Sequence, residues 1–202
     1  MKSPLVGLLC ACLSFTVAAE YSLSPTTKPT DLRQLGSANA PFTMYVFSSF
    51  SCPHCGMFHK EVLPTLKKEF VDTNQAKIVF VETPFDKYAL TATLIARCVS
   101  PTKWEDFSGT VYKMQYMWKN SSAAKRMFWD YAQKTGMSET DFNLCLANQD
   151  LNRKVTQQRN NMVNLYNVRS LPTVVLEKDG KNTSFAGTDK DLVEKLKLQG
   201  LK

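Results

Sequence analysis

The sequence predicts an α/β fold with the element order βαβ, a helical block, and then ββα. A length of 202 residues with 44% hydrophobic content is sufficient for one globular domain that carries an insertion. Strand-like apolar runs and helical spacing alternate early in the chain, and helical spacing alone continues through the middle. A Lys-Asp-Gly turn separates β-rich runs near the end. We therefore expect a sheet covered by helices, with a helical domain inserted into it.

The βαβ unit is predicted in residues 41–87. Residues 41–50, PFTMYVFSSF, are almost wholly apolar, which is typical of a central strand buried on both faces. Pro53 suits the first turn of the following helix, and Pro64 is expected to kink that helix because proline lacks an N–H. Residues 76–84, AKIVFVETP, predict the second strand. This unit is the first part of the main domain.

Residues 88–150 show helical spacing throughout and are interpreted as an inserted helical domain. A stripe of tryptophan, phenylalanine and methionine side chains within them indicates core packing rather than a cofactor site. A long helix over residues 151–168 follows, and then a hairpin around Asp179-Gly180 and a final helix, because Asp-Gly between β-rich runs is a strong turn signal. Residues 151–202 are therefore the second part of the main domain.

Residues 1–19 have the features of a cleavable signal peptide, with an early lysine, an apolar stretch, and small residues Val17 and Ala19 at the spacing of a cleavage site. The stretch is shorter than the ~20 residues of a membrane span, which disfavours an uncleaved anchor, and a lipidated leader is the other alternative. Residues 20–40, rich in proline and threonine, are expected to be a linker. No retention signal follows Lys202, so the expected destination is a bacterial periplasm.

The formal net charge of +7 is spread along the chain without a run of five like charges. Nucleic-acid binding needs basic residues clustered with aromatic residues on one element, and no such stripe is present. We therefore expect no nucleic-acid partner. The sequence also predicts no bound cofactor and no metal.

Two of the six cysteines lie in the predicted signal peptide and four lie after it. Cys10 and Cys12 lie in the predicted signal peptide, and thiols that remain after export tend to pair. The remaining four, which permit three pairings, are Cys52, Cys55, Cys98 and Cys145. For Cys98 and Cys145, both in the helical block, a structural disulfide is favoured over two buried thiols, and its loop would contribute ~4 kcal/mol.

The segment Cys52-Pro53-His54-Cys55 lies between a buried strand and a helix. Unpaired N–H groups and the helix dipole favour negative charge there, so we expect Cys52 to be a thiolate and the nucleophile. Cys55, one turn further on, is close enough to attack a mixed disulfide at Cys52 and release the product. His54 would favour the anion further. Because thiolate stabilisation favours the reduced protein, the oxidised form is predicted to give disulfides to substrates.

These motifs resemble the DsbA-like thiol:disulfide oxidoreductases of the thioredoxin superfamily. The resemblance covers roughly residues 40–197 in element order, and its motifs are CPHC after a strand, Leu171-Pro172-Thr173 before a hairpin, and a Phe185-Ala186-Gly187 turn. It implies a thioredoxin-like fold with an inserted helical domain. It also implies that the Leu171–Pro172 bond is cis and faces the CPHC loop, and that the Leu171 backbone pairs with the substrate chain.

The resemblance also implies partners. Unfolded or reduced exported proteins would be the substrates, and a membrane quinone-linked, DsbB-like protein would reoxidise the cysteine pair. Isomerases of this superfamily are usually dimers with an N-terminal dimerisation region, whereas only about twenty residues lie between the predicted leader and the first strand. We therefore expect a monomer.

Two positions depart from the family pattern. Thioredoxin-like proteins often carry a buried acid six residues before the first active-site cysteine, and here that residue is Val46. His59, one helical turn beyond Cys55, is a candidate proton relay in its place, although an exposed position on the helix is the expected one. Leu171 is bulkier than the valine or threonine frequent before that proline, which bears on partner preference.

Two alternatives stay open at this point. The same fold could serve a reductase or isomerase that a membrane donor keeps reduced. Alternatively, Cys52, Cys55 and His59 could supply ligands for zinc or copper. The metal alternative is weaker, because the chain has only two histidines and no second closely spaced pair of ligands.

Overall fold

A computed structural model describes residues 32–202, and it contains a five-stranded sheet with the order β1-β3-β2-β4-β5. The predicted signal peptide and residues 20–31 lie outside the described residues. Strands β2 and β3 pair in parallel, and the other neighbours pair antiparallel. The strands are β1 Gln34–Leu35, β2 Phe42–Ser48, β3 Ala76–Glu82, β4 Thr173–Lys178 and β5 Lys181–Ala186. The predicted central strand is therefore β2, between β3 and β4.

Strand β1 lies in the segment that the sequence analysis treated as a linker. Gln34 and Leu35 pair with β3 at one edge of the sheet. The guanidinium of Arg33 donates hydrogen bonds to the carbonyl oxygens of Arg97, at 2.8 Å, and Val99, at 2.7 Å. The linker interpretation is wrong for these residues, because a two-residue strand leaves no periodic pattern and its anchor is distant in sequence.

The helix after the active-site loop changes its hydrogen-bond register before Pro64. Its successive parts are α1 Pro53–Met57, a π-helical turn Phe58–Val62, α2 Leu63–Leu66 and a second π-helical turn Lys67–Val71. The N–H of Leu63 donates to the Phe58 carbonyl, one residue beyond the regular α-helical acceptor. The expected disturbance at Pro64 therefore takes the form of a π turn directly before it.

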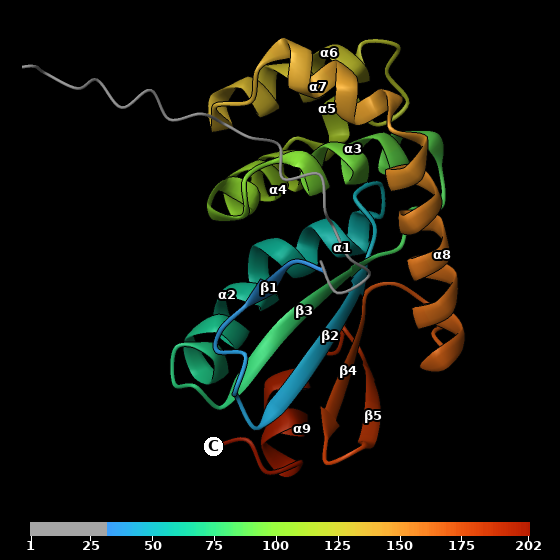
Figure 1. Cartoon of the computed structure of the whole chain (residues 1–202). Helices are drawn as coiled ribbons and strands as arrows, with labels where there is room; N and C mark the ends of the chain where they lie inside the picture. The colour runs from blue at the N-terminus through green and yellow to red at the C-terminus, as the bar shows by residue number, and fades with distance from the viewer. Residues whose placement is uncertain (1–31) are drawn as a thin grey trace, which may run out of the picture.

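The sheet is covered on both faces. Helices α1, α2 and α9, Leu192–Leu198, pack against one face, and helix α8, Gln149–Leu165, packs against the other (Figure 1). Alternate residues of β2 explain this arrangement, because Met44 and Val46 point to the first face and Phe47 to the second. The β4–β5 hairpin turns at Asp179 and Gly180, both with positive φ, as the Asp-Gly signal predicts.

The helical block follows β3 and lies beyond the carboxyl ends of β2 and β3, above the sheet in Figure 1. Its aromatic stripe is core, because Trp104, Phe107 and Trp118 are buried. Its helices are α3 Lys87–Cys98, α4 Trp104–Lys113, α5 Gln115–Trp118, α6 Ala124–Ala132 and α7 Glu139–Ala147, with 3₁₀ turns at Pro101–Lys103 and Gln133–Thr135. We propose that residues 88–150 form an inserted domain between the two parts of the main domain, 41–87 and 151–202.

A disulfide joins Cys98, at the end of α3, to Cys145 in α7, with a Cα–Cα distance of 6.2 Å. The bridge closes a loop with a sequence separation of 47, which contributes about 4 kcal/mol in the chain-entropy account. It lies inside the helical block and leaves Cys52 and Cys55 as free thiols. Among residues 32–202, every helix is too short or too polar to cross a bilayer.

Candidate active site

The site begins where β2 ends. The chain passes through the buried residues Ser49 to Ser51, and Cys52 occupies the N-cap position of α1 with an extended backbone, φ −81° and ψ 117°. Pro53 fills the first helical position, where its missing N–H has no helical acceptor to lose. Pro53 and His54 are exposed, whereas Cys52 is only 8% exposed. Cys52 therefore lies just below the surface, at the N-terminus of α1 and beside two exposed residues.

The pKa of Cys52 is lowered to about 6. The largest cause is the hydrogen bond that the Cys55 thiol donates to the Cys52 sulfur, followed by the backbone N–H groups of Cys55 and His54 and the charge of His54. Burial opposes these effects. Cys52 is therefore mostly a thiolate at neutral pH. The helix N–H groups contribute as expected, and the neighbouring Cys55 thiol contributes more.

Cys55 behaves in the opposite way. Its side chain is fully buried, and it accepts a hydrogen bond from the Ser49 N–H at 3.4 Å. Its pKa is raised well above the ordinary range, first because its proton is held in the hydrogen bond to Cys52 and second because burial disfavours a second anion. The pair therefore carries one negative charge at neutral pH, located on the Cys52 sulfur.

The loop before β4 faces this pair. The Leu171–Pro172 peptide bond is cis, and the Leu171 carbonyl oxygen lies 3.8 Å from Cys52 Sγ. The Gly187 N–H donates to the Pro172 carbonyl at 2.8 Å, and a Cβ at position 187 would lie 2.8 Å from the Pro172 ring. Only glycine fits against this ring, which accounts for the last residue of the Phe-Ala-Gly motif.

His59 is not the exposed helix residue that the sequence suggested. Its ring is half-buried, stacks on Tyr112 with centroids 3.9 Å apart, and lies 5.7 Å from the Phe80 ring. Its Nε2 is 3.3 Å from Ser48 Oγ, which is also 3.0 Å from the Tyr112 hydroxyl. Burial lowers the pKa of His59 to about 3, so the imidazole is neutral at physiological pH.

Residues 27–197 match the thioredoxin family. The chain belongs to the thioredoxin family. A putative protein-disulfide oxidoreductase of Rickettsia conorii is 30% identical over 115 residues, which are 56% of this chain and 42% of that relative. This thioredoxin-family chain therefore matches less than half the length of the rickettsial relative.

Further similarities of this member of the thioredoxin family are to a disulfide bond formation protein and to a DsbA structure. Disulfide bond formation protein D of Bacillus subtilis is 25% identical over 177 residues, 80% of this chain and 75% of that protein. The crystal structure of Wolbachia pipientis alpha-DsbA1 superposes with a TM-score of 0.76 at 20% identity, over 85% of this chain and 91% of the other. The predicted thioredoxin-like fold is confirmed.

The thioredoxin-family position Val46 is fully buried, but a buried acid lies on the neighbouring strand. Glu82, at the end of β3, is paired in the sheet with Ser48 of β2. Its carboxylate accepts a hydrogen bond from the guanidinium of Arg97 at 2.6 Å, and both side chains are almost fully buried. This ion pair was not among the predicted site residues, although an acid at the end of an apolar strand is a signal for a buried partner.

The metal alternative finds no support in this arrangement. Within residues 32–202, no group of three histidine, cysteine, aspartate or glutamate side chains is positioned to hold a metal ion. His59 Nε2 faces Ser48 Oγ, and the proton of Cys55 is held by Cys52. A dithiol with a low-pKa sulfur at the helix N-terminus and a high-pKa, fully buried sulfur one turn further on is instead suited to thiol–disulfide exchange.

Proposed function

We propose that this protein is a periplasmic disulfide oxidase that donates disulfide bonds to reduced exported proteins through Cys52-Pro53-His54-Cys55. The observation that carries the proposal is the opposed acidity of Cys52 and Cys55 at a helix N-terminus. Each unit of pKa depression at Cys52 stabilises the reduced pair by ~1.4 kcal/mol, which corresponds to ~30 mV for a two-electron couple. The oxidised pair is therefore a ready electron acceptor.

The exchange proceeds through a mixed disulfide at Cys52. A substrate thiolate attacks Cys52 Sγ in the oxidised pair, the Cys52–Cys55 bond breaks, and Cys55 takes up a proton. A second substrate thiolate then attacks the substrate sulfur of the mixed disulfide and expels Cys52 as a thiolate. The substrate has lost two electrons and the enzyme has gained them. A low pKa makes Cys52 a good leaving group for this last step.

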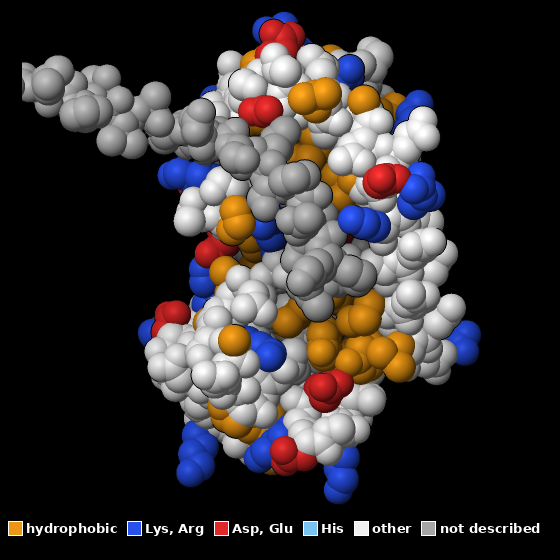
Figure 2. Space-filling view, in the orientation of Figure 1, with side chains coloured by type: hydrophobic (Ala, Val, Ile, Leu, Met, Phe, Trp, Pro, Cys, Tyr) orange, Lys and Arg blue, Asp and Glu red, His pale blue; other side chains and the backbone are white. Residues whose placement is uncertain are grey.

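Substrate recognition is proposed to use the backbone of Leu171 beside the reactive sulfur. An extended chain can pair with this backbone with little dependence on its sequence. Hydrophobic side chains gather between α8 and the sheet (Figure 2), where Tyr45, Met162 and Tyr166 are only partly buried. Such a surface suits unfolded chains, whose apolar side chains are exposed.

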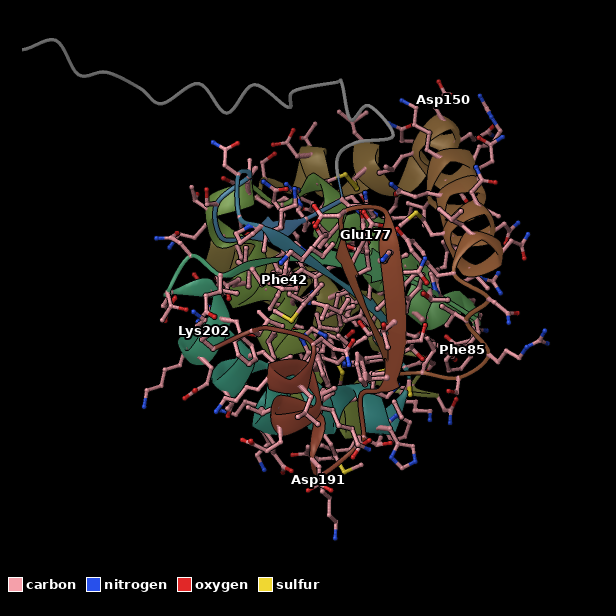
Figure 3. The ribbon with its side chains drawn as sticks, turned by 90° about the horizontal axis from the view of Figure 1, so that it is seen from below. Phe42, Phe85, Asp150, Glu177, Asp191 and Lys202 are labelled. Atoms are coloured by element: carbon pink, nitrogen blue, oxygen red, sulfur yellow. A yellow bond between two sulfur atoms is a disulfide. The ribbon has the colours of Figure 1, made fainter. Side chains whose placement is uncertain are left out.

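We propose Phe85 as a second apolar contact for a substrate chain. It is 56% exposed and is labelled among the side chains in the view from below (Figure 3). Because β2 and β3 are parallel, their carboxyl ends lie at the same end of the sheet. Cys52 follows the end of β2 and Phe85 follows the end of β3. We propose that a substrate chain approaches the protein at this end of the sheet.

The cellular setting is part of the proposal. We propose that residues 1–19 direct export, that the protein acts in the periplasm as a monomer, and that a membrane quinone-linked, DsbB-like protein reoxidises it. Cys55 would then resolve the mixed disulfide formed between Cys52 and that partner, which restores the oxidised pair. Mass spectrometry of the protein recovered from the periplasm tests the export step, because the proposed mature chain starts near Glu20.

The direct test of the activity uses a reduced test protein with no other oxidant present. Oxidised enzyme in stoichiometric amount is expected to remove two thiols from the test protein for each enzyme reduced, far faster than glutathione disulfide does. A reductase would instead break disulfides of a test protein in the presence of a thiol donor. If only that second reaction ran, the oxidase assignment would be wrong.

His54 is predicted to set part of the oxidising strength. Its N–H and its charge both favour the Cys52 thiolate, and only the charge is lost in His54→Ala. We expect the glutathione equilibrium of that variant to shift toward a weaker oxidant by up to about tenfold, one pKa unit. Lys60→Ala, an exposed cation further along the same helix, is the matched control. Equal equilibria for the wild type and His54→Ala would contradict the prediction.

We also propose that His59 relays the proton of Cys55. A neutral imidazole can accept at one nitrogen while it donates at the other, and the Ser48 and Tyr112 hydroxyls extend its hydrogen bonds. His59→Phe keeps the ring stacking and removes the relay. The rate at which Cys55 resolves a mixed disulfide is expected to fall on the order of a hundredfold. If stopped-flow measurements gave the same rate for His59→Phe and the wild type at every pH, the proton of Cys55 would exchange with solvent and not through His59.

A further inference from the structure

Gln115 connects the helical block to the active-site loop. It is the first residue of α5, is half-buried, and lies 63 residues from Cys52 in sequence. Its Nε2 donates to the Cys52 carbonyl oxygen at 3.0 Å and also to the Phe50 carbonyl oxygen. The two carbonyls at the start of the reactive segment are therefore held by one side chain from another part of the chain.

The orientation of this amide is determined by its partners. Carbonyl oxygens only accept hydrogen bonds, so the amide nitrogen of Gln115 must face them, and both of its N–H groups are used. Its Oε1 points toward Gly56, where an added Cβ would lie 3.2 Å away. The missing side chain of Gly56 leaves the room that Gln115 needs to reach the loop.

The contact also has an electrostatic consequence. The carbonyl oxygen of Cys52 carries partial negative charge in the same residue as a sulfur that is anionic when the pair is reduced, and the Phe50 carbonyl lies two residues before it in the chain. Two N–H groups directed at these oxygens offset that charge. In the oxidised pair the sulfur is neutral, so the same hydrogen bonds matter less. The contact is therefore worth more in the reduced form.

We propose that Gln115 is a positioning residue for disulfide exchange, through which the helical block fixes the active-site loop and favours its reduced state. The inference rests on the proposed function for its biological meaning. The hydrogen bonds from Gln115 to the loop, in contrast, are observed in the structure whatever the function of the protein. Gln115 does not touch the reacting sulfur bond, and it acts through the backbone that presents Cys52.

Three substitutions separate an electrostatic role from a merely structural one. Gln115→Met keeps the length and removes the donors, Gln115→Glu places a carboxylate against the two carbonyls, and Gln115→Lys retains a donor and adds positive charge. The readouts are the glutathione equilibrium and the pH profile of Cys52 alkylation. Gln157→Met, at an exposed glutamine of α8, is the matched control.

We expect Gln115→Met to weaken the oxidant by roughly three- to tenfold and to move the alkylation profile to higher pH, the scale of one neutral hydrogen bond. Gln115→Glu should shift both further in the same direction, and Gln115→Lys should shift neither in that direction. Wild-type values for Gln115→Met, or the same shift in Glu and Lys variants, would overturn the proposal. If the Met variant does not fold, the contrast between Glu and Lys decides.

These readouts are independent of the proposed oxidase activity. Both the glutathione equilibrium and the alkylation profile can be measured in a protein that oxidises no test substrate. A wild type without oxidase activity would therefore refute the proposed function, and the ordering of the Gln115 variants would still decide on the positioning role.

Discussion

Cys52→Ser is expected to abolish disulfide transfer to a reduced test protein. A serine hydroxyl is not ionised at neutral pH and forms no disulfide, so no mixed disulfide can form at this position. The rate should fall by more than about a thousandfold, the scale of removing a catalytic nucleophile. The measurement is the loss of free thiols from the test protein under stoichiometric enzyme.

The fold of this variant should be retained, because serine is nearly isosteric with a cysteine that makes no structural bridge. Circular dichroism and the intact Cys98–Cys145 bridge check this. Lys60→Ala, which changes an exposed side chain and keeps both active-site cysteines, serves as the active control. A folded Cys52→Ser protein that oxidises the test protein at the wild-type rate would refute the assignment of the nucleophile.

Cys55→Ser is expected to trap mixed disulfides. Cys52 keeps its place at the helix N-terminus, but a disulfide formed there with a partner lacks the buried thiol that would resolve it. Covalent complexes should accumulate in expressing cells and disappear on reduction. They are measured as slow-migrating bands on non-reducing gels, with partners identified by mass spectrometry.

The double variant Cys52→Ser with Cys55→Ser is the control for these complexes. It should form none through residues 32–202, because the other two cysteines in this part of the chain, Cys98 and Cys145, are bridged to each other. Complexes of equal amount in the double variant would mean that another thiol captures the partners. In that case the resolving role of Cys55 would be wrong.

The parts of the fold that follow from local pattern were predictable. The apolar run of β2 predicted a central strand, and Asp179-Gly180 predicted the hairpin turn. Each depends on residues that are adjacent in sequence, where periodicity and turn chemistry act directly. The position of the active-site cysteines at a strand–helix junction belongs to the same class.

The remaining features depend on contacts between distant residues. Arg33 binds carbonyls more than sixty residues away, and Gln115 reaches the loop before α1 from the helical block. The burial of His59 depends on Tyr112, which the sequence places on another helix. Such contacts leave no local periodicity, because any polar side chain on a half-buried face looks the same in sequence.

The lowered pKa of Cys52 also has one part that was predictable from the sequence and one part that was not. The sequence predicted a lowered pKa from helix amides and His54, and both contribute. The largest cause is the Cys55 thiol, whose direction toward Cys52 is a matter of side-chain geometry. The two cysteines are therefore coupled, and neither can be treated as an isolated group.

This coupling makes the stability of the reduced protein depend on pH. Cys52 has a lower pKa in the folded protein than the ~8.5 of an unperturbed thiol, so its anion stabilises the folded reduced form. That stabilisation is complete above the unfolded pKa and is lost as the pH falls through about 6. The oxidised protein, which has no such anion, should lack this dependence.

The most direct test of the account is an ultraviolet titration of the Cys52 thiolate in the reduced wild-type protein, with the oxidised protein as the blank. The account predicts a single transition at a pH of about 6. A sulfur that stays protonated until the ~8.5 of an ordinary cysteine would contradict it, because the driving force for giving disulfides away would then be missing.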